Sequence, residues 1–497
     1  MSDESFRYAA GESHDCVVPA KTPNKDPRGS AEGLEGRRSI KENTGESNPS
    51  RTQSRVIGSR GLEGVREAAK RDRGLRFTAL LHHVTEGLLR DSFYSLQRQA
   101  APGVDRVTWQ QYEQGLEERI KDLHGRVHRG AYRARPSRRI YIPKADGRQR
   151  PLGIAALEDK IVQQAVVTVL NAIYEEDFTG VSYGFRPGRS AHDALDALSV
   201  GIMRKKVNWI LDADVRGFFD NLDHGRLVAF IEKRVGDRRV LRLIQKWLKA
   251  GVSEDGEWSE TKVGTPQGAV VSPLLANIYL HHVLDQWVME WRKKYAYGDV
   301  IIVRYADDFV LGFQHRKEAE RFLKQLRERL REYGLELHSD KTRLIEFGRY
   351  AAGNRQREGN GKPETFNFLG FTHICGVIHK TGRFTVKRKT VGKRMAAKLK
   401  AIKAELRRRM HEPIKVIGEW LRAVVRGYFN YHAVPGNFSR LRSFRHDVIR
   451  HWWLAVRRRG QRSLRRAVFD RIVAQYLPTP AILHPYPLER FCAKHPR

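Results

Sequence analysis

The chain has 497 residues, 40% of them hydrophobic, which is enough for a sizeable core and for two or three domains of about 150 residues each. A mean hydropathy of −0.58 and the lack of an apolar run near the ~20 residues that span a bilayer exclude an integral membrane protein. Three separated cysteines (Cys16, Cys375, Cys492) form no C-x-x-C pair, which excludes a disulfide scaffold or zinc ribbon and suits a reducing cytosol. The acidic first residues predict no secretory leader.

The charge is high and unevenly distributed. Lysine and arginine number 92 against 57 acidic residues, a net charge of +35, which indicates a polyanionic partner, most often nucleic acid. Residues 381–497 hold 29 basic and 6 acidic residues, a net +23, whereas residues 1–60 hold 10 and 9, a net +1. Because residues 1–60 are rich in Gly, Ser, Pro, Asn and Glu and lack apolar periodicity, we expect a disordered tail there.

The remaining chain divides by its periodicity. A helical stretch is predicted near 64–98 and ends at the breaker Ala101-Pro102-Gly103. From about 124 to 371 short β-rich runs alternate with amphipathic helices, an α/β pattern. One helix is predicted from apolar residues at helical spacing followed by Gly334: Ala319, Phe322, Leu323, Leu326, Leu330 and Tyr333. From about 385 onward we expect basic helices.

Two aspartates interrupt the apolar run Val300–Leu311. Its apolar, β-branched flanks predict a hairpin with Asp307 and Asp308 at the tip. Adjacent like charges repel, so some interaction must favour two aspartates at this point. Either turn chemistry, which favours Asp, or a divalent metal such as Mg²⁺, which takes hard oxygen ligands, would supply it.

A second apolar run, Trp209–Asp214, carries Asp212 and Asp214 two residues apart, on one face of a predicted strand. Carboxylates in such a run are costly to bury unless they are paired or bind a metal. The spacing alone does not choose between the two aspartates, and a strand end lined by salt bridges explains them equally well.

A Gly/Pro-rich loop, Gly264-Thr265-Pro266-Gln267-Gly268, leads into an apolar helix. Ser272 before Pro273 predicts the N-cap of that helix. Glycines allow the backbone to approach a flat ligand closely. Taken alone, this segment could also be an ordinary buried helix with no ligand.

Together and in this order, the three segments resemble motifs A, B and C of the reverse transcriptase palm. The wider resemblance, over roughly 64–490, is to the group II intron reverse transcriptase/maturase family, of the bacterial type that lacks an endonuclease module. Further matching segments are Ala101–Asp105, Tyr141–Lys144, Arg150–Ile154, Ser182–Pro187, Asp340–Thr342 and Phe368–Phe371.

The resemblance implies an α/β (α+β) fold, with right-hand fingers and palm followed by an α-helical thumb. It divides the chain into a tail (1–60), an N-terminal helical extension (61–123), fingers and palm (124–373), the thumb/maturase domain X (385–475) and a C-terminal tail (476–497).

The resemblance selects Asp214 over Asp212 and implies that Asp214, Asp307 and Asp308 hold two Mg²⁺ ions. A primer 3′-OH would attack the α-phosphate of a dNTP, and two metals stabilise the attacking and leaving oxygens. Lys341 resembles the motif D lysine that protonates pyrophosphate, although a lysine after a strand is usually just solvated.

Other residues match the nucleotide and primer contacts of the family. Lys144 and Arg150 correspond to fingers residues that hold the triphosphate, Gln267 to the motif B contact, and Phe219 to the aromatic residue that excludes a 2′-OH. Phe219 could equally be a core side chain. Phe368, Leu369 and Gly370 resemble the primer grip, or an ordinary core strand.

The basic C-terminal region resembles the thumb and domain X. Arg alternates with aromatics in Glu419–Arg422, Arg426–Tyr431 and His451–Leu454, as in many RNA-binding surfaces. We expect the aromatics to point inward and the arginines outward, making one basic face. Two departures from the family are Arg106, where Gly is usual, and the lack of a Cys-pair-plus-His endonuclease segment.

The resemblance therefore implies an RNA-directed DNA polymerase of the bacterial cytosol or nucleoid. Its expected partners are group II intron RNA, whose splicing it would assist, an RNA template with a DNA primer, dNTPs and target DNA, with no membrane. The alternatives are a splicing factor with a vestigial palm, a reverse transcriptase recruited for defence or repair, and a DNA-templated polymerase.

Overall fold

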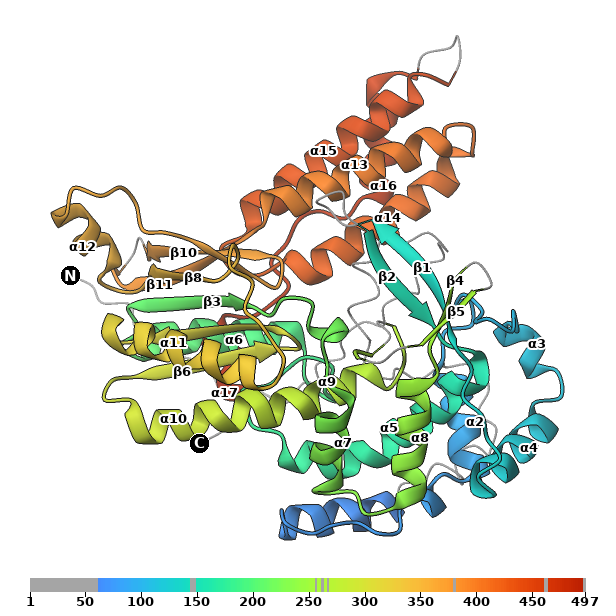
Figure 1. Ribbon diagram of the computed structural model, residues 1–497. Helices are drawn as coiled ribbons and strands as arrows, with labels where there is room; N and C mark the ends of the chain where they lie inside the picture. Colours follow the sequence, from blue (N-terminus) through green and yellow to red (C-terminus); the bar gives the residue numbers. More distant parts are fainter. Residues whose placement is uncertain are drawn as a thin grey trace, which may run out of the picture.

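The structure is a computed structural model that describes residues 61–143, 149–254, 257–260, 263–265, 268–378, 381–459 and 464–494 (Figure 1). The predicted tail over 1–60, Lys144 and Gln267 lie outside the described residues. Helices and sheets are mixed along the chain, as the α/β pattern predicts. Within the described part, each helix is too short or too polar to cross a bilayer.

The N-terminal region is built from short helices. A helix over residues 61–71 is followed by a 3₁₀ turn and further helices: η2 (Leu81–His83), α2 (Glu86–Ser95), α3 (Trp109–Glu113) and α4 (Leu116–His128). The prediction of one helical stretch over 64–98 is therefore wrong between residues 72 and 85. Phe77 leaves the helix to form a β-bridge with Val235, and the Thr85 hydroxyl accepts from the amide of Leu88 to begin α2 anew.

The loop at Arg106 keeps a shape that suits glycine. Arg106 takes a φ of 56°, in the left-handed region that glycine adopts readily, and its amide donates to the carbonyl of Gly103 at 3.3 Å. The departure from the family pattern is therefore accommodated by a strained arginine.

Strands β1 (Ser137–Pro143) and β2 (Gln149–Ile154) form an antiparallel hairpin, extended by β4 (Val252–Glu254) and β5 (Glu257–Ser259). Helices α5 (Leu157–Asp177) and α6 (Ala191–Arg204) lead from the hairpin to β3 (Trp209–Asp214), the first strand of the central sheet in the chain. After β3 come η3 (Phe218–Asp220), α7 (His224–Glu232) and α8 (Arg238–Lys249), which precede β4.

The central sheet has the strand order β6–β7–β3–β8, all neighbours antiparallel: β3 (Trp209–Asp214), β6 (Val300–Tyr305), β7 (Asp308–Phe313) and β8 (Arg343–Glu346). The predicted hairpin is confirmed as β6–β7. Its two-residue turn is Ala306-Asp307, so Asp308 is the first residue of β7 rather than part of the turn.

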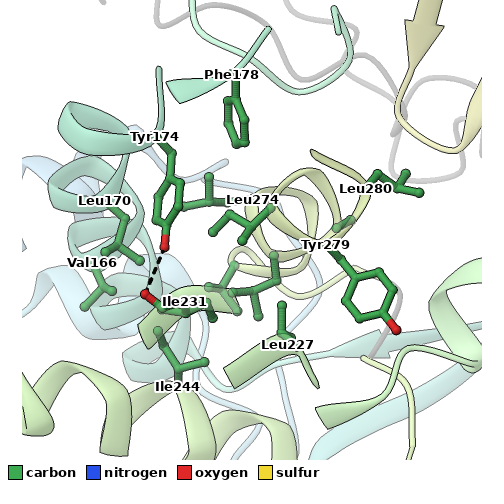
Figure 2. Close-up of a cluster of buried hydrophobic side chains, with 14 of the residues drawn as sticks. Val166, Leu170, Tyr174, Phe178, Leu227, Ile231, Ile244, Leu274, Tyr279 and Leu280 are labelled. Atoms are coloured by element: carbon green, nitrogen blue, oxygen red, sulfur yellow. Dashed lines mark hydrogen bonds between the residues drawn. The ribbon is translucent and has the colours of Figure 1, made fainter. Parts of the chain in front are cut away.

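Helices cover the central sheet. A long helical segment runs through α9 (Ser272–Leu280), the π-helix η4 (His281–Asp285) and α10 (Gln286–Tyr295). The predicted amphipathic helix is α11 (Arg316–Glu332), with Ala319, Phe322, Leu326 and Leu330 fully buried. These helices share one hydrophobic core with α5, α7 and α8, and Figure 2 shows part of it, where the Tyr174 hydroxyl donates to the carbonyl of Ile231.

A small sheet links the central sheet to the C-terminal helices. Its strands are β9 (Phe366–Phe368), β10 (Phe371–Val377) and β11 (Phe384–Thr390), after the short α12 (Ala351–Arg357). Helices α13 (Gly392–Arg408), α14 (Ile414–His432), α15 (Phe438–Val456) and α16 (Arg466–Tyr476) then enclose a separate apolar core and form the upper part of Figure 1. The last helix, α17 (Pro487–Lys494), returns to pack on α6, where Arg490 pairs with Asp196.

Candidate active site

Three aspartates lie at one end of the central sheet. Asp214, the last residue of β3, lies directly opposite Asp308 at the start of β7, and Asp307 precedes it in the turn. Directly opposed residues of an antiparallel pair have Cα atoms about 4.5–5.5 Å apart, so these side chains are neighbours. Asp308 is exposed and Asp307 half-buried, so the group is open to solvent.

The two aspartates of β3 have different surroundings. Asp212 lies deeper along the strand, opposite Arg343 of β8, and its Oδ2 is 3.6 Å from that guanidinium. Burial raises the pKa of Asp212 to about 6, although Arg343 acts in the opposite direction. Asp214 lies beyond the last residue pair of β3 and β8, at the sheet end with Asp308. Of the two aspartates, only Asp214 shares the sheet end with Asp307 and Asp308.

Lys341 reaches the same carboxylate. Its Nζ is 2.5 Å from Oδ2 of Asp214, although the two residues are 127 positions apart. The loop that carries Lys341 is fixed to β3, because the amide of His338 donates to the carbonyl of Asp214 and Leu337 bridges to Val215. The lysine side chain is about half exposed.

Carboxylate oxygens are ligands that suit a hard divalent cation, and substrate and water can complete its coordination. Among the residues that the structure describes, no three His, Cys, Asp or Glu side chains form a ready-made metal cluster. Protein sites for Mg²⁺ usually supply only one or two carboxylates and leave the rest to water and substrate phosphates. Asp214 already holds the Lys341 ammonium, so this carboxylate is accessible to a cation.

The loop before α9 is clamped at both of its ends. The Thr265 hydroxyl hydrogen-bonds the Ser272 hydroxyl at 2.6 Å, and Oε1 of buried Gln163 accepts from the amides of Val270 and Val271. The prediction that Ser272 caps α9 is therefore wrong: the N-cap is Val271, and the Ser272 hydroxyl is used to close the loop. Gln267 belongs to this loop but lies outside the described residues.

Phe219 lies beside the same loop. It is half-buried in the 3₁₀ turn η3, which follows β3, and its carbonyl accepts from the amide of Thr265 at 2.8 Å. Its ring packs edge-on against buried Phe218. The structure thus joins the turn after Asp214 to the loop that carries Gln267.

The β1–β2 hairpin approaches this loop from another side. Gly268 has a φ of 106°, and a Cβ at this position would lie 3.0 Å from the carbonyl oxygen of Gly153 and 2.9 Å from the Leu152 side chain. Arg150, half-buried on the same strand β2, pairs in register with Ile142. Lys144, in the connection of this hairpin, lies outside the described residues.

The segment Phe368–Phe371 forms a tight turn under the C-terminal helices. Leu369 and Gly370 both have positive φ, 46° and 81°, as a two-residue hairpin turn requires. The Tyr431 hydroxyl of α14 donates to the carbonyl of Leu369 at 2.8 Å. Phe368 is buried in the core between the sheets, as the core-strand alternative predicts, and its primer contact stays a prediction.

Aromatic residues of the C-terminal helices point mostly inward. Trp452 is fully buried, and Tyr428 and Phe429 belong to the same core. Arg426, Arg457 and Arg458 are exposed. These residues agree with the prediction of inward aromatics and outward arginines, but Arg422 does not: it is half-buried and donates to the carbonyls of Gln475 and Tyr476.

Four residues that support the site were missed by the sequence analysis: Gln163, Asn277, Asp285 and Arg304. Each is a buried polar side chain in a mainly apolar segment. That contrast is the signal that could have found them, since a polar group is rarely buried without a partner.

Comparison with known proteins identifies similar chains. The family profile described as reverse transcriptase (RNA-dependent DNA polymerase) matches residues 142–373. The group II intron-encoded protein LtrA of Lactococcus lactis subsp. cremoris is 43% identical over 180 residues, which cover 36% of this chain and 30% of LtrA. Protein YkfC of Escherichia coli K12 is 33% identical over 315 residues, which cover 56% of this chain and 81% of YkfC.

A 91 kDa protein encoded in the cob intron of Schizosaccharomyces pombe is 35% identical over 222 residues, covering 44% of this chain and 27% of that protein. The chain thus spans less than a third of LtrA and of the yeast protein, but four-fifths of YkfC.

Proposed function

The chain belongs to the reverse transcriptase family of group II intron-encoded proteins, and on that basis we propose that it is an RNA-directed DNA polymerase. The observation that carries the proposal is the carboxylate group at the end of the central sheet, where Asp214 faces Asp308 and Asp307 occupies the turn beside them. The substrates are a DNA primer annealed to an RNA template, and dNTPs.

Asp214, Asp307 and Asp308 hold the metal ions in this proposal. Two Mg²⁺ ions, when bound, supply the positive charge that stabilises the attacking and leaving oxygens of nucleotidyl transfer. The chain's own task is to position the reactants and compensate charge. The open, solvent-facing placement of Asp308 supports this role, because the primer end and the triphosphate must reach the same point.

The cationic residues act on the triphosphate. Arg150 and Lys144 bind it from the β1–β2 hairpin, which packs on the loop of Gln267 through Gly268. Lys341 leaves Asp214 when metal binds and donates a proton to the leaving pyrophosphate. The Lys341–Asp214 contact supports this assignment, since it places the ammonium at the carboxylate group.

Phe219 contacts the sugar of the incoming nucleotide and excludes a 2′-OH, while Gln267 contacts the nucleotide from the opposite loop. The hydrogen bond between Thr265 and Phe219 supports this pairing, because it joins the two loops. The turn Leu369-Gly370, with Phe368, guides the primer strand.

The exposed arginines of α13–α16 bind intron RNA, and the protein thereby assists splicing and insertion into target DNA in the bacterial cytosol. The names of the relatives, intron-encoded proteins, support this part. The net +23 of residues 381–497 is also what an RNA surface requires.

Primer extension tests the proposal. Purified protein is given an RNA template, an annealed DNA primer, dNTPs and Mg²⁺, beside the Asp307→Asn variant. We expect extension by the wild type only, with equal RNA binding by both. Extension by Asp307→Asn would refute the metal assignment, whereas tight RNA binding without extension by the wild type would favour a splicing factor with a vestigial palm.

A further inference from the structure

Arg304 is a fully buried charge three residues before Asp307. It lies on β6, has no exposed side-chain surface, and forms a two-point ion pair with equally buried Asp285: Nε to Oδ1 at 2.7 Å and Nη2 to Oδ2 at 2.6 Å. Replacing such a pair by apolar residues of similar size is often neutral or stabilising. Stability alone therefore gives little reason for a charge pair at this place.

The rest of the guanidinium holds the turn of the site. Nη1 of Arg304 donates to the carbonyl of Ala306 and to Oδ1 of Asn277, both at 2.9 Å. Nδ2 of Asn277 in turn donates to the carbonyl of Gly184 at 2.8 Å. One planar side chain thus connects η4, α9 and the β6–β7 turn, which requires the fixed fork of an arginine.

The π-helix explains how two partners reach one guanidinium. Asn277 and Asp285 are eight residues apart, and in a regular α-helix that separation leaves side chains about 80° out of line. The wider turn of η4, His281–Asp285, takes up less rotation per residue. It therefore brings Asp285 back toward the face that carries Asn277.

The turn itself needs support. Ala306 has a φ of 57°, a left-handed conformation that costs energy in any residue with a Cβ. The segment of Gly184 is packed directly behind it, because a Cβ on Gly184 would lie 2.3 Å from the amide nitrogen of Ala306. The carbonyl that Arg304 holds belongs to the peptide plane joining Ala306 to Asp307. Fixing that plane fixes the point from which the Asp307 carboxylate extends.

We propose that Arg304, held by Asp285 and Asn277, is the positioning residue that sets the Asp307 carboxylate for metal binding. This inference rests on the proposed polymerase function. It predicts that loosening the network slows the chemical step and raises the Mg²⁺ concentration that the reaction needs, while nucleotide binding changes little.

The test is single-nucleotide incorporation on an RNA template, with kcat, KM for dNTP, the Mg²⁺ concentration for half-maximal rate, and Tm measured for each variant. Arg304→Lys keeps the charge but not the fork. We expect kcat to fall about 100-fold, as small misplacements of reacting groups do. KM should stay within about threefold of the wild-type value, and the half-maximal Mg²⁺ concentration should rise severalfold.

Asn277→Ala is the milder variant, because it leaves the Arg304–Asp285 pair intact. We expect a loss in kcat of about tenfold with the same rise in Mg²⁺ requirement. This variant decides the question if Arg304→Lys does not fold.

Two matched controls remove similar interactions elsewhere. Arg234 is also buried, pairs with Asp177 at 2.8 Å and donates to the carbonyls of Asp72 and Leu75. Asn208 donates to backbone carbonyls at the opposite end of the central sheet. We expect Arg234→Lys and Asn208→Ala to lower Tm but to keep the wild-type kcat and Mg²⁺ requirement.

Wild-type kcat and Mg²⁺ dependence in Asn277→Ala and in a folded Arg304→Lys would overturn the inference and leave the proposed function standing. A loss in Arg304→Lys no larger than that in Arg234→Lys would overturn it as well. A wild type that extends no primer would overturn the proposed function, and this inference with it.

Discussion

The end of the central sheet and the helices α13–α16 are built on opposite principles. At the sheet end, polar groups are held one by one: Lys341 contacts Asp214, and Arg304 holds the carbonyl of Ala306. The C-terminal helices instead surround an apolar core and expose arginines such as Arg426 to solvent. The geometry of the sheet end depends on contacts between particular atoms. The stability of the C-terminal helices depends on the volume that fills their core, and their charge depends on the number of exposed arginines.

This difference predicts how each region responds to change. A single isosteric substitution at the sheet end should abolish one function and leave stability nearly intact. In the C-terminal helices, one core substitution should lower the free energy of unfolding. One surface substitution should change neither stability nor RNA binding by much.

The pair Asp214→Asn and Asp212→Asn tests whether function at the sheet end depends on individual side chains, and the largest effect is expected here. The two aspartates share a face of β3, but only Asp214 lies at the sheet end opposite Asp308. Loss of a metal ligand should cost several kcal/mol in the transition state, about 1,000-fold or more in kcat. We expect Asp212→Asn to retain activity within about threefold. Equal loss in both variants, measured by primer extension, would show that the site extends along the strand.

Trp452→Ala tests the apolar core of helices α13–α16. Trp452 is fully buried and packs edge-on against Phe469. Removing the indole should lower the free energy of unfolding of these helices by about 3–5 kcal/mol. Denaturant unfolding measures the change, with Leu454→Ala as the exposed control on the same helix. A loss below about 1 kcal/mol would contradict the assignment of this core.

His373 gives the small sheet between the two regions a pH dependence. Burial, with a contribution from Arg388, lowers the pKa of His373 to about 3, against 6.5 in the unfolded chain. The unfolded chain therefore takes up a proton below pH 6.5 that the folded chain refuses, and stability falls as the pH falls. Between pH 6.5 and 4.5 the loss from this group is about 2–3 kcal/mol.

The variant His373→Phe should remove that loss and keep the stacking on Phe366. Unfolding at pH 7 and pH 4.5 measures it, and His446→Gln, at an exposed histidine, should behave as the wild type. An unchanged pH dependence in His373→Phe would show that other groups cause the acid instability.

The smallest effects are expected on the charged surface. Changing Arg426, Arg457 and Arg458 together to Gln should weaken RNA binding a few-fold and reduce the slope of log K against log salt by about 1 for each phosphate that is no longer neutralised. The control changes three exposed cations of α11, Lys317, Lys324 and Arg327, to Gln. Equal losses in both variants would mean that RNA binding follows the total charge and is not localised on the C-terminal helices.

Local patterns predicted the elements of the site well. The β6–β7 hairpin follows from two apolar runs around a short acidic centre, and α11 follows from its helical spacing. The choice of Asp214 over Asp212 came only from resemblance to a family, because both side chains have the same spacing and face. The structure supplies the difference through Arg343 and Lys341.

Long-range contacts escaped prediction for a physical reason. The Lys341–Asp214 contact joins residues 127 positions apart, and no local pattern encodes it. The Arg304–Asp285 pair depends on a π-helix, whose signal in the sequence is indistinguishable from that of an α-helix. A long-range contact also interrupts the helix predicted over 64–98: between residues 72 and 85, the bridge between Phe77 and Val235 overrides helical propensity.

The claim that Asp214, Asp307 and Asp308 hold a divalent metal is tested most directly by iron-mediated cleavage. The protein, bound to an RNA template and DNA primer, is loaded with Fe²⁺ in place of Mg²⁺ and treated with ascorbate and peroxide, so that radicals formed at the metal cut the nearby backbone. We predict cuts next to Asp214 and within the turn at 305–308 in the wild type, suppressed by excess Mg²⁺ and lost in Asp307→Asn. Cuts elsewhere, or the same cuts in Asp307→Asn, would show that these aspartates do not hold the metal.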